Sequence, residues 1–158
     1  AGYSKDIELR YDTNLSVINN KVIDKWKHFK NVISVDPFIN DYDPNDITCE
    51  FMPLENVFVK FTELINKLDN VSHIRMISDD AIKQLLETQV DFVYIDGLHT
   101  YDQVSKDIDN YLQIIKPNGS IGGHDYHRVY QGVINAVTEK LGEHDITFKD
   151  TSWIKKIK

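Results

Sequence analysis

The sequence has few of the features that mark secreted or membrane-embedded proteins. Its 158 residues include one cysteine, Cys49, so no disulfide can form within the chain. No apolar run approaches the roughly 20 residues that cross a bilayer. The first ten residues, AGYSKDIELR, lack the apolar stretch of a secretory signal. We therefore expect a soluble, cytoplasmic protein that does not bind membranes.

Positive charge is also scarce. The chain has 18 Lys and Arg against 25 Asp and Glu, which gives a formal net charge of −7. An acidic protein repels nucleic-acid phosphates unless a local basic stripe overrides the net field. The densest basic stretches, residues 25–30 and 155–158, are short. We therefore expect no nucleic-acid partner.

Glycine is present at only seven positions, and none of them forms a G-x-G-x-x-G turn. That turn brings bare backbone against the pyrophosphate of a dinucleotide. Its absence disfavours a nucleotide-binding oxidoreductase.

What the sequence does contain is an alternation of short β-type apolar runs with helical periods. This pattern predicts an α/β fold: one domain over residues 1–158 with a doubly wound, mainly parallel, Rossmann-like sheet flanked by helices. The length and the 41% apolar content fit one hydrophobic core. We expect strands over 31–36, 73–78, 90–96 and 120–126, helices over 15–26, 54–68, 81–86, 101–115 and 130–141, and a closing antiparallel hairpin over 146–157.

Acidic and polar residues follow four of the expected strands. They are Asp36, Ser78 with Asp79, Asp96, and His124 with Asp125. Ligands of open α/β sheets bind beyond the carboxyl ends of the strands. Aspartates at such positions also cap helices and form turns, and that alternative stays open for each one.

Each acid has a chemical use at a strand end. Asp36, after the first expected strand, could accept both hydroxyls of a ribose. Asp96 and Asp125 could hold a hard divalent cation such as Mg²⁺, which prefers oxygen ligands. A bound cation would lower the pKa of a substrate hydroxyl. His99, His124 and His127 leave open a nitrogen-rich transition-metal site that includes Asp96.

Residues 90–126, VDFVYIDGLHTYDQVSKDIDNYLQIIKPNGSIGGHDY, carry a family resemblance. The IDG-x-H-x-Y strand end, the long helix, the K-P-x-G turn and the GGHDY strand end resemble class I S-adenosylmethionine (SAM) dependent methyltransferases. The sequence is most similar to the small-molecule O-methyltransferase group that includes macrocin O-methyltransferase. VDPF and TSWI-x-K, elsewhere in the chain, also match.

The resemblance implies roles for the donor-binding residues. Asp36 corresponds to the ribose-binding acid of the family, and Ser78 and Asp79 fall where the family contacts adenine. The E-x-G-x-x-x-G turn that normally opens these enzymes is missing. One register places Glu8 at the acid of that motif, with a strand over residues 7–11. The other treats residues 2–4 as a remnant of the turn. The alternating pattern favours Glu8.

The resemblance also implies roles at the reacting centre. Asp96 matches an acid that can serve as metal ligand and as general base toward the substrate hydroxyl. Asp125 and His124 match the pair that completes the Mg²⁺ site, and His99 falls beside the reacting centre.

The function expected is methyl transfer from SAM to a hydroxyl of a small molecule, such as a sugar or glycosylated metabolite, with Mg²⁺ assistance. Because the glycine-rich turn is missing, the alternative is a methyltransferase-like domain without catalysis that serves as a binding or assembly module. The sequence also leaves a homodimer open.

Overall fold

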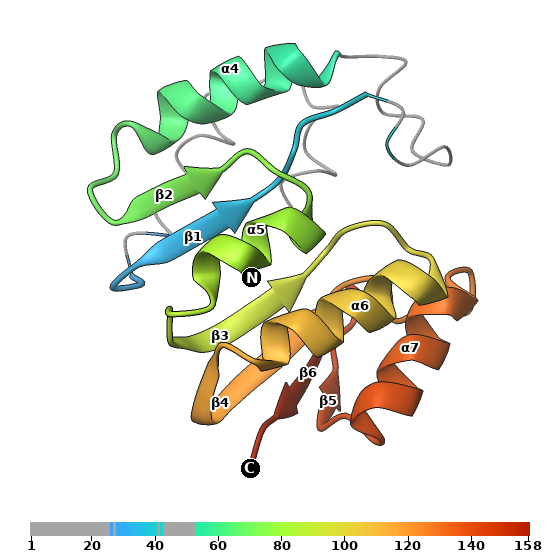
Figure 1. Cartoon of the computed structure of the whole chain (residues 1–158). Coiled ribbons are helices and arrows are strands. Elements are labelled where there is room, and N and C mark those ends of the chain that lie inside the picture. The colour runs from blue at the N-terminus through green and yellow to red at the C-terminus, as the bar shows by residue number, and fades with distance from the viewer. Residues whose placement is uncertain (1–25, 27, 41, 43–52) are drawn as a thin grey trace. The chain divides into compact units, whose positions relative to one another are not determined.

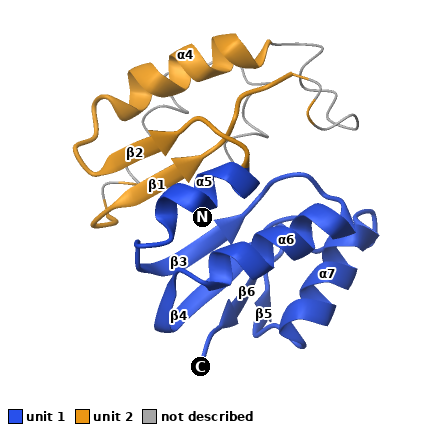
Figure 2. Cartoon of the chain, in the orientation of Figure 1, with its two compact units in different colours: residues 1, 78–158 blue, residues 2–77 orange. Residues whose placement is uncertain are grey.

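The computed structural model describes residues 26, 28–40, 42 and 53–158. The chain divides into two compact units, which Figure 2 colours separately: residues 2–77 in orange and residues 1 and 78–158 in blue. In chain order we call residues 2–77 the first unit and residues 78–158 the second unit; the key of Figure 2 numbers them the other way round, as unit 2 and unit 1. Glu8 and Cys49 lie outside the described residues, as does the helix expected over 15–26 apart from Trp26. Each unit is described by itself below.

The first unit contains strands β1 (Val32–Val35) and β2 (Val71–Ile74) and helix α4 (Leu54–Ile65). The two strands pair in parallel from Val32 opposite Val71, as Figure 1 shows. Residues on one face of α4 are buried together with aromatic side chains of the unit, in a cluster of Trp26, Phe38, Phe61, Leu64 and Ile65. The strand expected over 31–36 and the helix expected from 54 are confirmed.

The strand expected over 73–78 is shifted. β2 begins two residues earlier and ends at Ile74, where the amide of Met76 donates to the Ile74 carbonyl at 3.0 Å. The next side chain, Arg75, pairs with Glu55 and places its guanidinium 4.0 Å from the centre of the Phe58 ring. Such contacts with α4 are long-range, and strand periodicity does not reveal them. Ser78 therefore begins a helix rather than ending a strand.

His73 of β2 lies among aromatic rings. Its ring centre is 5.4 Å from that of Phe38, 5.7 Å from Phe58 and 5.0 Å from Phe61. Burial lowers the pKa of His73 from 6.5, and the charge of Arg75 acts in the same direction, while nearby backbone carbonyls oppose both. The neutral imidazole is therefore the form that this unit favours.

His73 should make the stability of this unit depend on pH. Because the folded pKa lies below the unfolded pKa, the unfolded state binds more protons as the pH falls through about 6.5. The free energy of unfolding is therefore expected to be highest above that pH and to decline below it. Denaturant unfolding between pH 8 and pH 5 measures the effect.

His73→Phe should weaken this decline, because a phenyl ring fits the aromatic surroundings and does not titrate. His28→Phe is the control, since His28 is exposed. An equal decline in His73→Phe and in the parent would show that His73 is not its source.

The second unit contains α5 (Ser78–Leu85), β3 (Val90–Ile95), α6 (Tyr101–Leu112), β4 (Ile115–Gly123), α7 (Gln131–Leu141), β5 (Ile146–Thr147) and β6 (Trp153–Lys156). Its four-stranded sheet has the order β3-β4-β6-β5. β3 and β4 are parallel, whereas β6 runs antiparallel to both β4 and β5. The closing hairpin is therefore confirmed.

The core of this unit lies where α6 and α7 pack with β4 and β6. Its fully buried members have relative exposures of 0–8%, and they are Val104, Ile108, Ile115, Ile121, Val133, Ala136, Val137 and Trp153. The helix stripe predicted from the sequence supplies Val104 and Ile108. Thr100 caps α6 by accepting a hydrogen bond from the amide of Gln103 at 3.3 Å.

β4 is longer than the sequence predicts. The K-P-x-G segment, expected to be a turn, lies inside β4, where the register against β3 shifts between Val90 and Phe92. Asn118 adopts a positive φ of 64° there, a conformation that Asn tolerates better than most residues. β3 has β4 as its one partner among the described strands, although its composition predicts the middle of a sheet.

The α/β fold class, the parallel pairing and the terminal hairpin are confirmed. The single domain over 1–158 stays a prediction. Within the described ranges, no helix has the length and apolar character needed to cross a membrane.

Candidate active site

Two parallel strands of the second unit bring the predicted catalytic residues together. Ile95, the last residue of β3, lies opposite Gly123, the last residue of β4. The amide of His124 continues this pairing by donating to the Ile95 carbonyl at 3.0 Å. Asp96 and His124 therefore leave the sheet at the same edge, and Asp125 follows directly.

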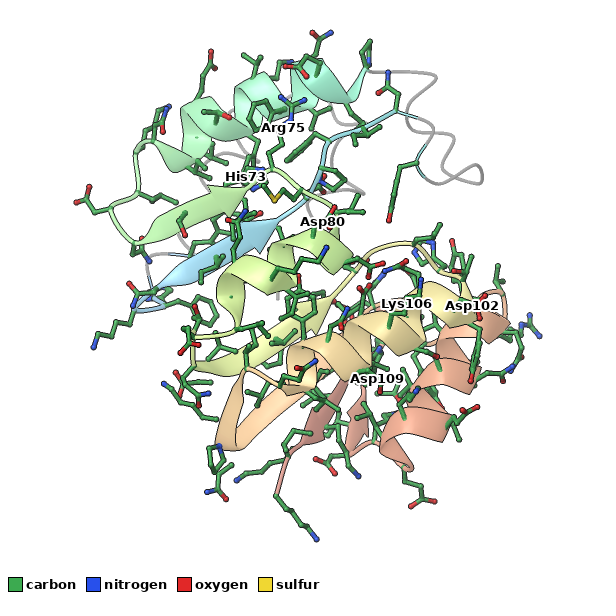
Figure 3. All side chains as sticks on the ribbon, in the orientation of Figure 1. His73, Arg75, Asp80, Asp102, Lys106 and Asp109 are labelled. Carbon is green, nitrogen blue, oxygen red and sulfur yellow. The ribbon has the colours of Figure 1, made fainter. Side chains whose placement is uncertain are left out.

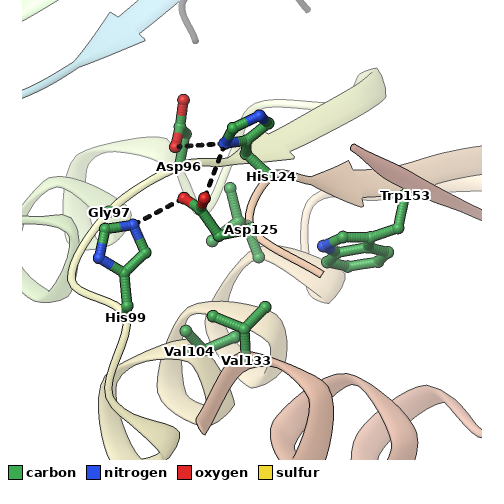
Figure 4. A pocket seen from close by; sticks show the side chains of 9 residues that line it. Asp96, Gly97, His99, Val104, His124, Asp125, Val133 and Trp153 are labelled. Atoms are coloured by element: carbon green, nitrogen blue, oxygen red, sulfur yellow. Dashed lines mark ion pairs between the residues drawn. The ribbon is translucent and has the colours of Figure 1, made fainter. Parts of the chain in front are cut away.

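The side chains at this edge form a cluster of two carboxylates and two imidazoles, seen in Figure 4. His99 Nε2 lies 2.7 Å from Asp125 Oδ2, and His124 Nδ1 lies 3.1 Å from Asp125 Oδ1. His124 Nδ1 is 4.0 Å from Asp96 Oδ1. Asp125 thus contacts both imidazoles and holds their orientation.

The backbone at Asp125 is in the left-handed region, with φ of 59°. Aspartate adopts this region more readily than most residues, but it still costs free energy that other contacts must offset. Flanking hydrogen bonds hold the turn: the amide of Tyr126 donates to the Thr151 carbonyl at 3.0 Å, and the amide of His127 to the Asp125 carbonyl at 2.7 Å. This turn directs the Asp125 carboxylate toward the histidines.

His99 is fixed from a second side by α7. A β-carbon at Gly132 would lie 2.7 Å from the His99 carbonyl, so only glycine permits the first turn of α7 to approach this backbone so closely. The ring of Tyr130 lies over the His99 ring, with centres 4.5 Å apart. The His99 side chain is therefore held between Asp125 and Tyr130.

A small hollow adjoins the cluster. It is lined by Ile95, Asp96, Gly97, His99, Val104, His124, Asp125, Val133 and Trp153. Two of its buried polar atoms, Asp96 Oδ2 and Trp153 Nε1, have no hydrogen-bond partner among the described residues. A buried polar atom without a hydrogen-bond partner lowers stability, so these two atoms suit a bound group that would supply the missing hydrogen bonds.

The environment separates the acidities of the two carboxyls. Burial raises the pKa of Asp96 to about 6; the Asp125 charge adds to the rise, while the charges of His124 and His99 oppose it. Burial also acts to raise the pKa of Asp125, but the hydrogen bond from His99 and the charges of both imidazoles outweigh it and leave that pKa below its usual value. Carboxyls separated in this way suit different roles, one exchanging a proton near neutral pH and one staying ionised.

A sequence profile described as "Methyltransferase domain" matches residues 15–126, more than half of the chain. The chain belongs to the methyltransferase domain family. Together with the α/β fold, this places it among the class I SAM-dependent methyltransferases. No curated protein sequence matches the chain.

Solved structures share the methyltransferase fold at low sequence identity. CalS11, a TDP-rhamnose 3′-O-methyltransferase of calicheamicin biosynthesis, matches with a TM-score of 0.58 and 9% identity, over 94% of this chain and 68% of that one. The fibrillarin pre-rRNA processing protein of Methanococcus jannaschii matches with a TM-score of 0.50 and 14% identity, over 80% of this chain and 55% of that one. At such identities the likeness supports the fold alone.

The residues predicted to bind the methyl donor lie in different parts of the methyltransferase chain. Asp36 follows β1, and its Oδ1 accepts the amide of Phe38 at 2.7 Å, which is the turn-forming role left open by the sequence. Ser78 and Asp79 begin α5 in the other unit. Glu8 lies outside the described residues. The donor-binding roles of these residues stay predictions.

The predicted metal ligands do come together. Asp96, His124 and Asp125 each offer an atom, and these atoms lie within 4.8 Å of one another. Two carboxylates and an imidazole fit a divalent cation, although the imidazole makes this set richer in nitrogen than the oxygen-only site typical of Mg²⁺. His127 is exposed and lies outside this group, so the four-residue transition-metal site is not assembled among the described residues.

The sequence did not predict two parts of this region. Trp153, part of the TSWI-x-K segment, lines the hollow, a place that the sequence did not indicate. Gln103 of α6 bonds Ser78 at the start of α5 and also Asp107, which Ser78 bonds in turn. The sequence did contain one signal for this network, because Asp107 directly precedes Ile108 of the apolar helix stripe. In the structure Asp107 is 5% exposed.

Proposed function

We propose that this methyltransferase transfers the methyl group of SAM to a hydroxyl oxygen of a small molecule, a sugar or a glycosylated metabolite, with a divalent cation at Asp96, His124 and Asp125. The observation that carries the proposal is the cluster at the ends of β3 and β4. There, two carboxyls of separated acidity and two imidazoles surround one hollow. The O-methyltransferase activity in the name of CalS11 supports the choice of oxygen as acceptor.

Methylation of a hydroxyl releases a proton, and Asp96 is the residue proposed to accept it. Its pKa of about 6 lies near neutral pH, in the range where a carboxylate can exchange a proton as a general base. Within the part of the chain that the structure describes, its Oδ2 has no hydrogen-bond partner, and Asp96 lines the hollow. When bound, SAM supplies an electrophilic methyl group, which joins the substrate oxygen as the sulfur–carbon bond breaks.

The other residues of the cluster orient the reactants. Asp125 stays ionised and holds His99 by the 2.7 Å contact to Nε2. His99 then presents a fixed imidazole edge to the substrate hydroxyl beside the reacting centre. A cation on Asp96, His124 and Asp125 would lower the pKa of that hydroxyl. Alignment and proton removal are the main protein contributions to such a displacement.

The donor side of the site rests on the resemblance. We assign Asp36 to the ribose hydroxyls, Ser78 and Asp79 to adenine, and Glu8 to the acid of the missing glycine motif. The absence of that motif favours one second candidate, a methyltransferase-like domain that binds a partner without catalysis. SAM turnover distinguishes the two.

The direct test supplies SAM with a labelled methyl group and a panel of free and nucleotide-linked sugars. We expect label in a product that survives mild alkali, because a methyl ether is stable where a methyl ester hydrolyses. An excess of S-adenosylhomocysteine (SAH) should suppress the labelling. Label in an alkali-labile product, or in none, would contradict the proposal of hydroxyl methylation.

The proposed cation at Asp96, His124 and Asp125 is tested by a separate experiment. Removing divalent ions with a chelator should lower the transfer rate, and added Mg²⁺ or Mn²⁺ should restore it. Asp125→Asn should reduce that response, whereas Asp145→Asn should not, since Asp145 precedes β5, lies near Lys155 and does not line the hollow. A rate that does not change on chelation would remove the metal from the account.

A further inference from the structure

A buried polar network joins α6 to the start of α5 within the second unit. Gln103 Nε2 lies 3.1 Å from Asp107 Oδ1, one turn later on the same helix. The same nitrogen lies 3.2 Å from Ser78 Oγ and 3.2 Å from Asp79 Oδ1, at the first turn of α5. One amide thus connects both residues that we assign to adenine.

Asp107 is the buried centre of this network. It is 5% exposed, and a carboxyl so buried is costly unless hydrogen bonds compensate it. Burial raises the pKa of Asp107, while hydrogen bonds from Ser78 and Gln103 oppose the rise. The carboxyl is therefore held in place by its bonds to these two side chains.

The network also fixes the orientation of the Gln103 amide. Its –NH₂ group has two hydrogens, and two of its three neighbours are carboxylates that accept hydrogen bonds only. The nitrogen must therefore face Asp79 and Asp107. A side chain without an amide at position 103 would leave both carboxylates without this donor.

Further contacts place the network between the start of α5 and the loop that follows β3. The Tyr111 hydroxyl donates to the Ser78 carbonyl at 3.3 Å. Asp107 Oδ2 is the nearest atom to a β-carbon built at Gly97, at 3.8 Å, so it lies below the loop that follows β3. Asp79 itself keeps 36% of its side chain exposed, with Lys106 Nζ at 3.8 Å, and can accept another donor (Lys106 is labelled in Figure 3).

We propose that Gln103 and Asp107 are positioning residues for the purine ring of SAM. They hold the first turn of α5 so that the Asp79 carboxylate faces a purine 6-amino group. This inference rests on the proposed function, since it assumes that Ser78 and Asp79 contact adenine. Neither residue takes part in the chemical step, so their replacement should affect donor recognition more than the rate at saturating donor.

The test compares SAH with S-inosylhomocysteine, in which a carbonyl replaces the 6-amino group. The intact chain should bind SAH more tightly than the inosyl analogue. In Gln103→Leu the affinity for SAH should fall about tenfold, as expected when a charge-assisted contact is misplaced, and the preference over the analogue should fall toward one. Calorimetric titration with each compound measures both quantities.

Matched controls come from the same helix. Gln113→Leu removes an exposed amide that donates to the Asp109 carbonyl, and Asp109→Asn removes an exposed carboxylate that pairs with Lys140. Both should keep the parental preference. Asp107→Asn, which keeps the size of the side chain, should behave as Gln103→Leu does and decides the matter if Gln103→Leu does not fold.

The outcomes separate the two proposals. If the intact chain binds neither compound, the proposed function fails and this inference fails with it. If the intact chain prefers SAH and the variants keep both the affinity and the preference, only the inference is overturned. Equal losses for the two compounds, with the preference intact, would assign the network a purely structural role and would also overturn it.

Discussion

Asp96→Asn is expected to lower kcat by about 10²–10⁴-fold, the range that general-base catalysis contributes. Asparagine has nearly the same shape but cannot accept the proton of the substrate hydroxyl. In the parent, burial brings the pKa of Asp96 to about 6, and one oxygen of this hollow-lining residue has no hydrogen-bond partner in the described ranges. Initial rates at saturating SAM and substrate measure the loss, and added Mg²⁺ should not restore the rate.

Asp91→Asn is the matched control, since Asp91 lies on β3, the strand that Asp96 follows. Its side chain is 86% exposed and pairs with Lys116, an arrangement that contributes little to stability. We expect parental rates in this variant. SAH affinity should be preserved in Asp96→Asn, because the lost function is in the chemical step. Parental turnover in Asp96→Asn would remove Asp96 from the mechanism.

Trp153→Ala is expected to lower the free energy of unfolding by about 3–5 kcal/mol, as for other large aromatic residues removed from a core. Trp153 is 1% exposed and belongs to the core cluster between α6, α7 and the sheet. A β-carbon at Gly123 would lie 2.9 Å from its Nε1 and 3.0 Å from its Cζ2, so the strand packs directly against the indole. Because the neighbouring atoms are already packed this closely, we expect the cavity left by the indole in Trp153→Ala to stay largely unfilled.

Two further variants separate packing from hydrogen bonding at this position. Trp153→Phe keeps much of the aromatic volume, and the lost N–H has no partner among the residues that the structure describes, so we expect a smaller loss of stability than in Trp153→Ala. Ile146→Ala is the exposed control on β5, where the side chain is 51% exposed. Denaturant unfolding measures all three. A Trp153→Ala variant as stable as the control would contradict the packing account.

The residues of the reacting centre could be predicted from the sequence because their placement depends on local sequence patterns. A parallel strand ends at a polar residue, and neighbouring parallel strands bring their ends to one edge. The run before Asp96 is strongly β-type, and its end was predicted to within one residue. The strand before His124 contains three glycines and a proline, and it ends at Gly123, before the end expected at residue 126. What the sequence could not give is the left-handed turn at Asp125, which depends on the Thr151 carbonyl 26 residues away in the chain.

Other differences from the sequence prediction also arise from contacts between distant segments. β2 is displaced because Arg75 is engaged by Glu55 and Phe58 of α4. The Gln103–Asp107 network has no sequence motif, since its acceptors at Ser78 and Asp79 precede it by 24–25 residues. Periodicity assigns residues to a helix face, but it does not identify the polar partner that a buried Asp finds there.

The acids at strand ends also differ in what they do. Asp96 and Asp125 surround a hollow, whereas Asp36 uses one oxygen to accept the Phe38 amide. The same residue type in the same sequence context thus serves a turn in one unit and a cluster in the other. A donor-binding role for Asp36 therefore needs a measurement on the whole chain.

The most direct measurement is calorimetric titration of the whole chain with SAH. The account predicts saturable binding at one site, weakened at least tenfold in Asp36→Ala by loss of the charge-assisted bonds to ribose. Asp69→Ala, an exposed acid of the same unit, should bind as the parent does. A chain that gives no saturable binding with SAH or SAM at two temperatures would contradict the claim that this domain is a working SAM-dependent methyltransferase.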